Sequence, residues 1–456
     1  MNTLTKNPEQ RELFGHPIGL FFLFFSEMWE RFSYYGMRAI LTLYMVHEHT
    51  DTFNPGLGWT PGEALALYGW YTMLVYVASI PGGYIADKFI GQKKSVLYGG
   101  LILIVGQSIL AVSAMWAFYT GLILIIMGVG LLKPNISTMV GGLYKKGDIR
   151  RDKGFTIFYI GINLGAFLSA LIVGYVGEKI GWHYGFGLAG IGMTLGMIVY
   201  YIGMPYMKHV GNFIGKDGTE EEKALLNQPL TPVEKDRVKV LLLSFLIVIV
   251  FWGAFEQAGG LLNIYTQSKT DRMLDFTLPL IGNQVPASWF QSLNALFIIF
   301  LGTFVATWWA KHKLKGKEAS SLFKMAVGTM IMGAGFLFMS AATKEFEANG
   351  SSAMYWLVLA YLFHTIGELS MSPVALSFIT KLSPVKYGSI MMGVYFAMTG
   401  LGNKVAGLLG ESAVGFGEFA VFTGIAVFTI LFGILIIALL KPLKRLTHGA
   451  EDDEHL

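Results

Sequence analysis

The chain has 456 residues, of which 54% are hydrophobic and 14% are charged, and its formal net charge is +4. Soluble domains carry about 25% charged residues. This deficit, with a mean hydropathy of +0.53, indicates lipid as the solvent and nearly excludes a soluble enzyme. The dominance of apolar residues and the absence of cysteine exclude a disordered chain and a disulfide scaffold. The small, scattered positive charge gives no sign of nucleic acid as a partner.

The apolar residues form runs of about 20 residues or more, long enough to cross a bilayer as helices. The first run contains Glu27, Glu30 and Arg31 and is too long for the apolar part of a signal peptide, so we do not expect it to be cleaved. In chain order the runs lie near 17–46, 63–86, 95–114, 118–143, 154–177, 183–206, 237–262, 287–310, 320–342, 353–379, 386–408 and 417–440. They predict an all-α membrane protein with roughly twelve transmembrane helices.

The longest polar stretch, 207–236, divides these runs into two equal groups. We predict an N-terminal six-helix bundle at 1–206, a cytoplasmic linker at 207–236, a C-terminal six-helix bundle at 237–440 and a cytoplasmic tail at 441–456. No similarity between the halves is evident by eye, so this division depends on counting and spacing alone.

Basic residues outside the runs predict the orientation, because cytoplasmic loops carry an excess of Lys and Arg. With the N-terminus inside, the even-numbered loops are cytoplasmic and hold most of these residues, among them Lys93, Lys94, Lys145, Lys146, Arg150, Arg151, Lys311 and Lys313. The odd-numbered loops hold only Lys179, Lys269, Arg272 and Lys344. Both termini are therefore predicted to be cytoplasmic.

A few charged residues remain inside the predicted spans, with both signs equally represented. They are Glu27, Glu30, Arg31, Arg38, Lys133, Glu256, Glu368 and Lys404. Each costs about 3 kcal/mol or more at the bilayer centre unless it is paired or hydrated. Their presence indicates a polar pathway inside the protein.

Spacing and depth group these charges further. Glu27, Glu30, Arg31, Tyr34 and Arg38 share one face of the first helix, because their separations match the helical repeat. At about 1.5 Å per residue, the first three lie near the midplane of the membrane, and Lys133 and Glu368 lie at a similar depth. Arg38 and Glu256 lie about 10 Å nearer the extracellular side, where we predict a second ion pair.

Fixed charges of both signs at mid-membrane suit a zwitterion better than a sugar or a simple cation. Arg31 and Lys133 are candidates to hold a carboxylate, and Glu368 to accept a primary ammonium. Carboxylates beside Arg31 would also bind and release protons as that arginine changes partners, which is the outline of proton symport. The alternative is a set of structural ion pairs that lock helices together; it stays open for any single pair, and the shared face and depth favour a pathway.

Four segments resemble motifs of one known family. The segment at 27–35, EMWERFSYY, resembles the ExxERFxYY signature of the proton-dependent oligopeptide transporter family, within the major facilitator superfamily. FYIGINLG at 158–165 resembles the family's FYxxINxG signature, GYIADKFIG at 83–91 is similar to the facilitator loop motif, and GELSMSP at 367–373 resembles its tenth-span segment. The resemblance covers the chain from about residue 15 to 440.

This resemblance implies the major facilitator fold and uptake of di- and tripeptides into the cell by alternating access of two bundles. The inward proton gradient would drive uptake, with the proton as coupling ion and no cofactor or metal. It also implies a transporter and not an enzyme, located in the inner membrane and functional as a monomer.

The resemblance implies a role for each matching residue. Glu27 and Glu30 would be the proton-coupling carboxylates next to Arg31, Lys133 would join Arg31 on the peptide carboxylate, and Glu368 would receive the peptide N-terminus. The other implied peptide-binding residues are Tyr34, Tyr35, Tyr76, Asn163, Trp252, Asn294, Tyr395, Phe396 and Thr399. Arg38 and Glu256 resemble the extracellular gate pair.

The chain departs from the family pattern in two places. The linker is too short and too polar for the extra helix pair that many bacterial members insert between the halves, so we predict none. Mammalian relatives use a histidine near the second span for proton handling, and this chain has none between His49 and His183. Proton coupling is therefore expected to depend on carboxylates.

Other interpretations stay open for individual residues. Asn163 could be a helix-packing residue at a site rich in glycine. His364, one turn before Glu368, could tune that carboxylate, although we favour a histidine bonded to a neighbouring helix. For Lys404 we expect no substrate role; it could extend toward the membrane surface or pair with Glu411. The many glycines are most simply close-packing positions, although some could act as hinges; they include Gly181, Gly185, Gly187, Gly190 and Gly192.

Two other functions compete with peptide symport. The same fold could carry nitrate or another small solute, although Lys133, Glu368 and the glutamates of the first span favour peptides. A membrane enzyme ranks far behind, because no paired Asp, histidine cluster or Ser/His arrangement recurs near one membrane face.

Overall fold

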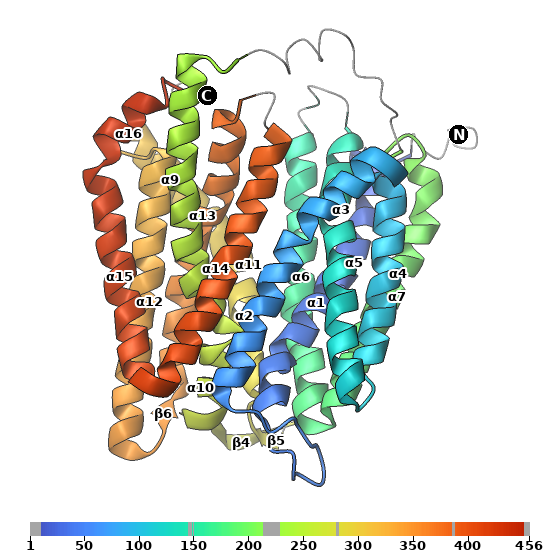
Figure 1. Ribbon diagram of the computed structural model, residues 1–456, viewed down its shortest axis with the longest axis vertical. Helices are drawn as coiled ribbons and strands as arrows, with labels where there is room; N and C mark the ends of the chain where they lie inside the picture. Colours follow the sequence, from blue (N-terminus) through green and yellow to red (C-terminus); the bar gives the residue numbers. More distant parts are fainter. Residues whose placement is uncertain are drawn as a thin grey trace. The chain divides into compact units, whose positions relative to one another are not determined.

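The structure is a computed structural model that describes residues 11–144, 148, 150–212, 229–279, 282–384 and 388–450. Within these residues the chain forms long helices and three two-stranded sheets (Figure 1). Ten helical segments of the described chain are long and apolar enough to cross a membrane. The protein is therefore an all-helical, multi-pass membrane protein, as its composition predicted.

The chain divides into two compact units. The first contains Met1–Trp59, Leu74–Lys216 and Leu274–Ala295, and the second contains Thr60–Met73, Asp217–Met273 and Leu296–Leu456. The long helices α2 (Pro61–Val77) and α11 (Ser292–Leu314) contribute residues to both units. The sequence-based division at 1–206 and 237–440 stays a prediction.

The first unit is built from long helices and short helical segments, and its five longest helices begin within about three residues of predicted runs. They are α1 (Ile18–Val46), α3 (Ser79–Ile85), η2 (Ala86–Ile90), α4 (Gln92–Leu110), α5 (Met115–Gly142), α6 (Arg151–Lys179), α7 (Trp182–Gly203), η3 (Met204–Met207) and η5 (Ala287–Gln291). Its short strands are β1 (Glu12–Leu13), β2 (His16–Pro17) and β5 (Gly282–Gln284), and β4 (Met273–Leu278) starts at the edge of the second unit.

The second unit has the same kind of construction. Its helices are α9 (Pro232–Phe255), η4 (Glu256–Ala258), α10 (Leu261–Lys269), α12 (Ser321–Asn349), α13 (Met354–Leu382), α14 (Gly388–Phe416), α15 (Glu418–Ala438) and α16 (Leu440–Leu446). A parallel pair of short strands, β3 (Thr270–Asp271) and β6 (Ser352–Ala353), lies beside them. The predicted linker includes residues 213–228 and the predicted tail includes 451–456, both outside the described residues.

Two helices, α9 and α2, begin with a threonine and a glutamate that cap the helix N-terminus. Thr231 and Glu234 form a capping box at α9, in which Glu234 N donates to Thr231 Oγ1 at 3.2 Å and Thr231 N donates to Glu234 Oε2 at 2.8 Å. Thr60 and Glu63 make the same exchange at α2. A proline follows each threonine at the first helical position. The backbone N–H at that position has no partner within a helix, so proline, which lacks it, loses no hydrogen bond there.

Glycines allow α1 to pack closely between α6 and α7 (Figure 1). A Cβ atom on Gly165 of α6 would collide with the carbonyl of Met28 and lie 3.1 Å from Cβ of Arg31. On α7, a Cβ atom on Gly192 would lie 2.6 Å from the ring of Phe32. The close-packing interpretation of Gly192 is confirmed, and small residues are what such membrane contacts require.

We predict that Gly165→Ala destabilises the protein, because the added methyl group must push α1 and α6 apart. Overpacking of this kind costs about 1–3 kcal/mol. Gly424→Ala is the matched control, since Gly424 lies inside α15 with no neighbouring atom within 4 Å of its virtual Cβ. Thermal unfolding in detergent should show a lower midpoint for Gly165→Ala and an unchanged or higher one for Gly424→Ala, and equal midpoints would contradict this packing.

Candidate functional site

The charged face of α1 forms one buried ion group. Nε of Arg31 lies 3.1 Å from Oε1 of Glu27 and also contacts a carboxylate oxygen of Glu30. The side chains of Arg31, Glu27 and Glu30 are 3%, 4% and 1% exposed. The i, i+3 and i+4 spacing that predicted this grouping from the sequence is what brings the guanidinium between the two carboxylates.

This ion group does not use all of its hydrogen-bonding capacity. Oε2 of Glu27, Oε1 of Glu30 and Nη2 of Arg31 are buried and have no hydrogen-bond partner among the described residues. Buried polar atoms in native proteins are normally paired, so unpaired ones at one place call for an explanation. Acceptor atoms on the carboxylates and a donor on the guanidinium are the atoms that a proton and an anionic ligand would use.

Aromatic rings surround the cations of the first unit. The guanidinium carbon of Arg31 lies 5.6 Å from the ring centre of Tyr34 and 5.8 Å from that of Tyr35. Arg38 lies over Tyr35 as well, at 5.1 Å. Such contacts stabilise a cation without neutralising its charge.

Lys133 joins this group from α5. Its Nζ lies 3.7 Å from the ring centre of Tyr76, and it is close enough to Glu27 to interact with it electrostatically. Pro134 follows Lys133 inside the helix and removes one backbone N–H from the hydrogen-bond ladder of α5. The structure thus brings together Arg31, Lys133 and Tyr76 with the α1 glutamates and tyrosines; we call these residues the first-unit cluster.

The opposite face of α1 is apolar. Met28, Trp29 and Phe32 line a cavity of about 230 Å³ together with residues of α6 and α7, including Gly165 and Gly192. No polar atom contributes to the lining of this cavity. The two faces of α1 therefore meet different surroundings, polar on one side and apolar on the other.

The two predicted asparagines have different environments. Asn163 is buried on α6, and its Nδ2 donates to the carbonyl of Tyr159 in the same helix at 3.0 Å. This bond lies within α6 and does not decide between the packing interpretation and the peptide contact, so both stay predictions. Asn294 is half-buried in the part of α11 that belongs to the first unit.

A second group of predicted residues meets in the second unit. The hydroxyl of Tyr395 on α14 lies beside the side chains of Ser372, Thr399 and Trp252, and Glu368 of α13 acts on it electrostatically. Thr399 also donates to the carbonyl of Tyr395 at 3.1 Å. We call these five residues the second-unit cluster.

Helix packing explains how these residues meet. The close approach of α9 and α14 depends on Gly402, whose virtual Cβ lies 2.8 Å from Cβ of Trp252. The ring of Phe396 lies 5.5 Å from that of Tyr395 and is half-buried. Sequence reasoning missed Ser372, although it lies one helical turn after Glu368 in the quoted GELSMSP segment.

Glu256 is buried in the second unit and accepts a hydrogen bond from the hydroxyl of Tyr68 on α2 at 3.2 Å. Tyr68 is a second residue that sequence reasoning missed, and its spacing of eight residues from Tyr76 on one helix face was the available signal. Arg38 belongs to the first unit. The pairing of Arg38 with Glu256 therefore stays a prediction.

His364 and Lys404 have apolar or aromatic neighbours. The ring of His364 is buried 4.5 Å from that of Phe336 on α12, and neither ring nitrogen has a hydrogen-bond partner among the described residues. His364 thus packs on a neighbouring helix, without the hydrogen bond that we favoured. Nζ of Lys404 lies 4.5 Å from the ring centre of Trp70.

Opposite charges among aromatic rings inside membrane-spanning helices are typical of a membrane transporter, and the comparisons agree. The family model described as POT family matches residues 93–228 and 231–418. Peptide transporter YePEPT of Yersinia enterocolitica is 34% identical over 100% of both chains, and the di-/tripeptide transporter of Lactococcus lactis subsp. cremoris is 33% identical over 96% of this chain and 98% of its own. The chain belongs to the POT family, which confirms the resemblance of its motifs; this is a family of transporters and not of enzymes.

Solved structures of the family have the same fold. A crystal structure of peptide transporter POT in complex with sulfate is similar with a TM-score of 0.86 and 34% identity, covering 96% of this chain and 97% of its own. A POT family transporter in complex with 5-aminolevulinic acid has a TM-score of 0.86 and 30% identity, covering 96% of this chain and 100% of its own. These matches extend over nearly the whole chain.

We predict that Arg31→Gln destabilises the protein by about 3–5 kcal/mol near pH 8, because two buried carboxylates lose their cation. Acidification neutralises carboxylates, so the loss should be smaller near pH 5. Thermal unfolding of the variant and the wild type in detergent at both pH values measures the difference. A loss that is equal at the two pH values would show that the ion group does not govern the effect.

Proposed function

We propose that the protein is a proton-coupled symporter that carries di- and tripeptides into the cell. It works by alternating access in the major facilitator fold, with about twelve transmembrane helices in two six-helix bundles. The protein acts as a monomer in the lipid bilayer of the inner membrane with both termini in the cytoplasm, and the proton is its only coupling agent. The observation that carries the proposal is the buried Glu27–Arg31–Glu30 group with its unpaired acceptor and donor atoms.

The relatives support the substrate class. Two curated relatives are named as a peptide transporter and a di-/tripeptide transporter. A structural relative was solved with 5-aminolevulinic acid, a small molecule with an amino group and a carboxylate.

Arg31 and Lys133 hold the peptide carboxylate in this proposal. A guanidinium binds a carboxylate through two parallel hydrogen bonds, and an ammonium adds a compact positive charge. The buried Nη2 of Arg31 supports this role for the arginine, and the position of the Lys133 ammonium over the Tyr76 ring and near Glu27 supports it for the lysine. Tyr34, Tyr35 and Asn294 contact the peptide around these cations.

Glu368 accepts the peptide ammonium. Tyr395, Trp252 and Thr399 lie around it in the second-unit cluster and, with Phe396, form the walls for peptide side chains. A half-buried carboxylate next to aromatic rings favours an ammonium over a neutral group, because both the charge and the ring faces attract a cation.

Proton coupling follows from competition for Arg31. Glu27 and Glu30 share its guanidinium, and a carboxylate that loses a cationic partner binds a proton more readily. When the peptide carboxylate pairs with the guanidinium of Arg31, one glutamate loses its ion pair and therefore becomes protonated. Proton and peptide then cross the membrane together. Two ionised glutamates without a cation are costly inside the membrane, and so is Arg31 without an anion.

The proposal is tested by uptake of a labelled dipeptide into proteoliposomes with and without an imposed inward proton gradient. We expect accumulation that depends on the gradient and disappears with a protonophore. Nitrate in place of the dipeptide tests the small-solute alternative. Peptide accumulation that does not depend on the gradient would contradict the symport mechanism. Transport of nitrate but not of peptide would show that the protein carries a small anion and not peptides.

Glu30→Gln separates coupling from binding. The amide keeps the shape of the side chain but does not titrate, so gradient-driven uptake should be lost while peptide counterflow stays measurable. Both activities are assayed in the same proteoliposome preparation. Loss of counterflow as well would assign Glu30 to peptide binding or to the structure.

Glu368→Gln tests the ammonium contact. The variant should weaken counterflow of a dipeptide with a free N-terminus more than that of its N-acetylated analogue, because only the first carries the ammonium. Glu411→Gln, at an exposed position of α14, is the matched control. Equal losses for the two peptides would count against the contact.

A further inference from the structure

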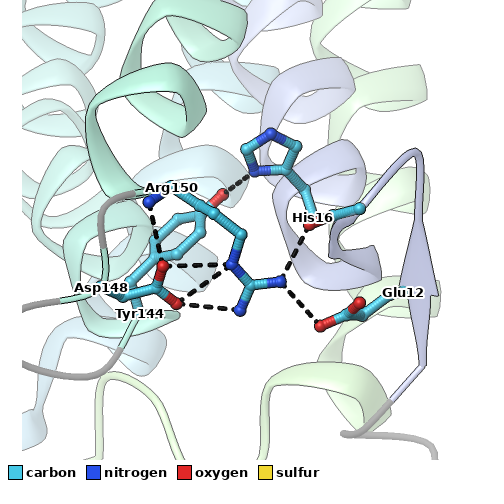
Figure 2. A network of polar contacts seen from close by, with 6 residues as sticks. Glu12, His16, Tyr144, Asp148 and Arg150 are labelled. Carbon is cyan, nitrogen blue, oxygen red and sulfur yellow. Dashed lines mark hydrogen bonds and ion pairs between the residues drawn. The ribbon is translucent and has the colours of Figure 1, made fainter.

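A polar network joins the start of α1 to the junction of α5 and α6. Before α1 the chain turns back on itself in a hairpin of β1 and β2, with Phe14 and Gly15 at φ values of 49° and 76° in the turn. His16 of this hairpin and Tyr144, which follows α5, are both buried, and Nδ1 of His16 lies 2.8 Å from the Tyr144 hydroxyl (Figure 2). The hairpin is therefore fixed to the end of α5.

Arg150, just before α6, completes the network. Its Nη1 donates to Oε1 of Glu12 and to the carbonyl of Gly15, both at 2.9 Å. Its Nη2 donates to Oδ2 of Asp148 at 2.9 Å, and Figure 2 shows the guanidinium between the two carboxylates. Hydrogen bonds from the side chain and then from the backbone of Arg150 lower the pKa of Asp148, so this carboxylate stays charged at neutral pH.

The network fits closely against α6. A Cβ atom on Gly154 would lie 2.6 Å from Cζ of Tyr144, so only glycine leaves room for the tyrosine ring. Tyr144 thus contacts α6 through its ring and the hairpin through its hydroxyl. One tyrosine and one arginine connect the ends of α1, α5 and α6.

These three helices each carry at least one predicted residue of the first unit: Arg31 lies on α1, Lys133 on α5 and Asn163 on α6. His16 precedes Glu27 by 11 residues and Tyr144 follows Lys133 by 11 residues. At about 1.5 Å per residue, each distance along the chain is about 16 Å. The network therefore joins α1 and α5 at corresponding distances from the first-unit cluster.

The position of α5 relative to α1 is supported by few direct contacts between the two helices. Among the described residues, α1 packs mainly against α6 and α7, whereas α5 packs mainly against α4 and makes few contacts with α1 or α6. Packing therefore restrains a tilt of α5 relative to α1 mainly through α4 and α7, and not through direct contact. Hydrogen bonds at the helix ends are directional, and they restrict such a tilt.

We propose that the His16–Tyr144–Arg150 network is a positioning device that sets Lys133 relative to Arg31 for recognition of the peptide carboxylate. The inference rests on the proposed function, in which these two cations hold that carboxylate. His16, Tyr144 and Arg150 touch no substrate in this scheme, and they act through the placement of α5.

Tyr144→Phe tests the device, because it removes only the hydroxyl. We measure KM in counterflow for a dipeptide and for its C-terminal amide, which lacks the carboxylate. Loss of one buried hydrogen bond should raise KM for the dipeptide by about threefold to tenfold and leave KM for the amide unchanged. His16→Ala should have the same effect, and the double variant should be no worse than either single one, since both remove one shared bond.

The matched control is Tyr201→Phe, a tyrosine exposed on α7. If Tyr144→Phe cannot be purified folded, Arg150→Lys replaces it, since an ammonium keeps the charge and loses the fork of donors. An equal change in KM for dipeptide and amide, or a fall in the unfolding midpoint with no change in either KM, overturns the inference. Failure of the wild type to carry dipeptides overturns the proposed function first and this inference with it.

Discussion

A guanidinium buried between two carboxylates inside a membrane-spanning helix is the constraint around which the first unit is built. Unpaired, each of these charges would be expensive in lipid, so Glu27, Glu30 and Arg31 require one another and require protein on the polar face of α1. Lys133 of α5 and Tyr76 of α2 meet that requirement, because they are close enough to interact electrostatically with Glu27 and with Arg31. The apolar face of the same helix can then point elsewhere, toward the cavity lined by Trp29.

The two clusters share an arrangement but differ in the sign of the charge. In each, a charged side chain lies among aromatic rings on closely packed helices: Lys133 over Tyr76 in the first unit, and Glu368 beside Tyr395 in the second. Aromatic faces keep water out and are compatible with a cation, and they compete little for hydrogen bonds. Such surroundings hold a charge ready for a ligand of opposite charge, which is what a carrier of zwitterions needs.

Much of the fold could be predicted because the decisive signals are local. The apolar runs at 95–114 and 118–143 correspond to α4 and α5 within about four residues, since the length of an apolar run limits where a helix can cross lipid. The 3₁₀ turn of η4, which separates α9 from α10, lies within the predicted run 237–262 and has no signal in hydropathy. In the site, helix periodicity predicted the Glu27–Arg31 contact, whereas Tyr68 and Ser372 were missed because their partners Glu256 and Tyr395 lie on other helices.

The sequence by itself determined the membrane class, the approximate helices, the charged face of α1 and the family, because each depends on composition or on spacing within one short segment. Only the tertiary structure decided which side chains of different helices meet: Lys133 with Tyr76, Glu256 with Tyr68, and His16 with Tyr144. Depth along a helix can be counted from the sequence at a fixed rise per residue. The rotation and lateral neighbours of a helix cannot, since they follow from which glycines allow close approach and from the packing of all the helices at once.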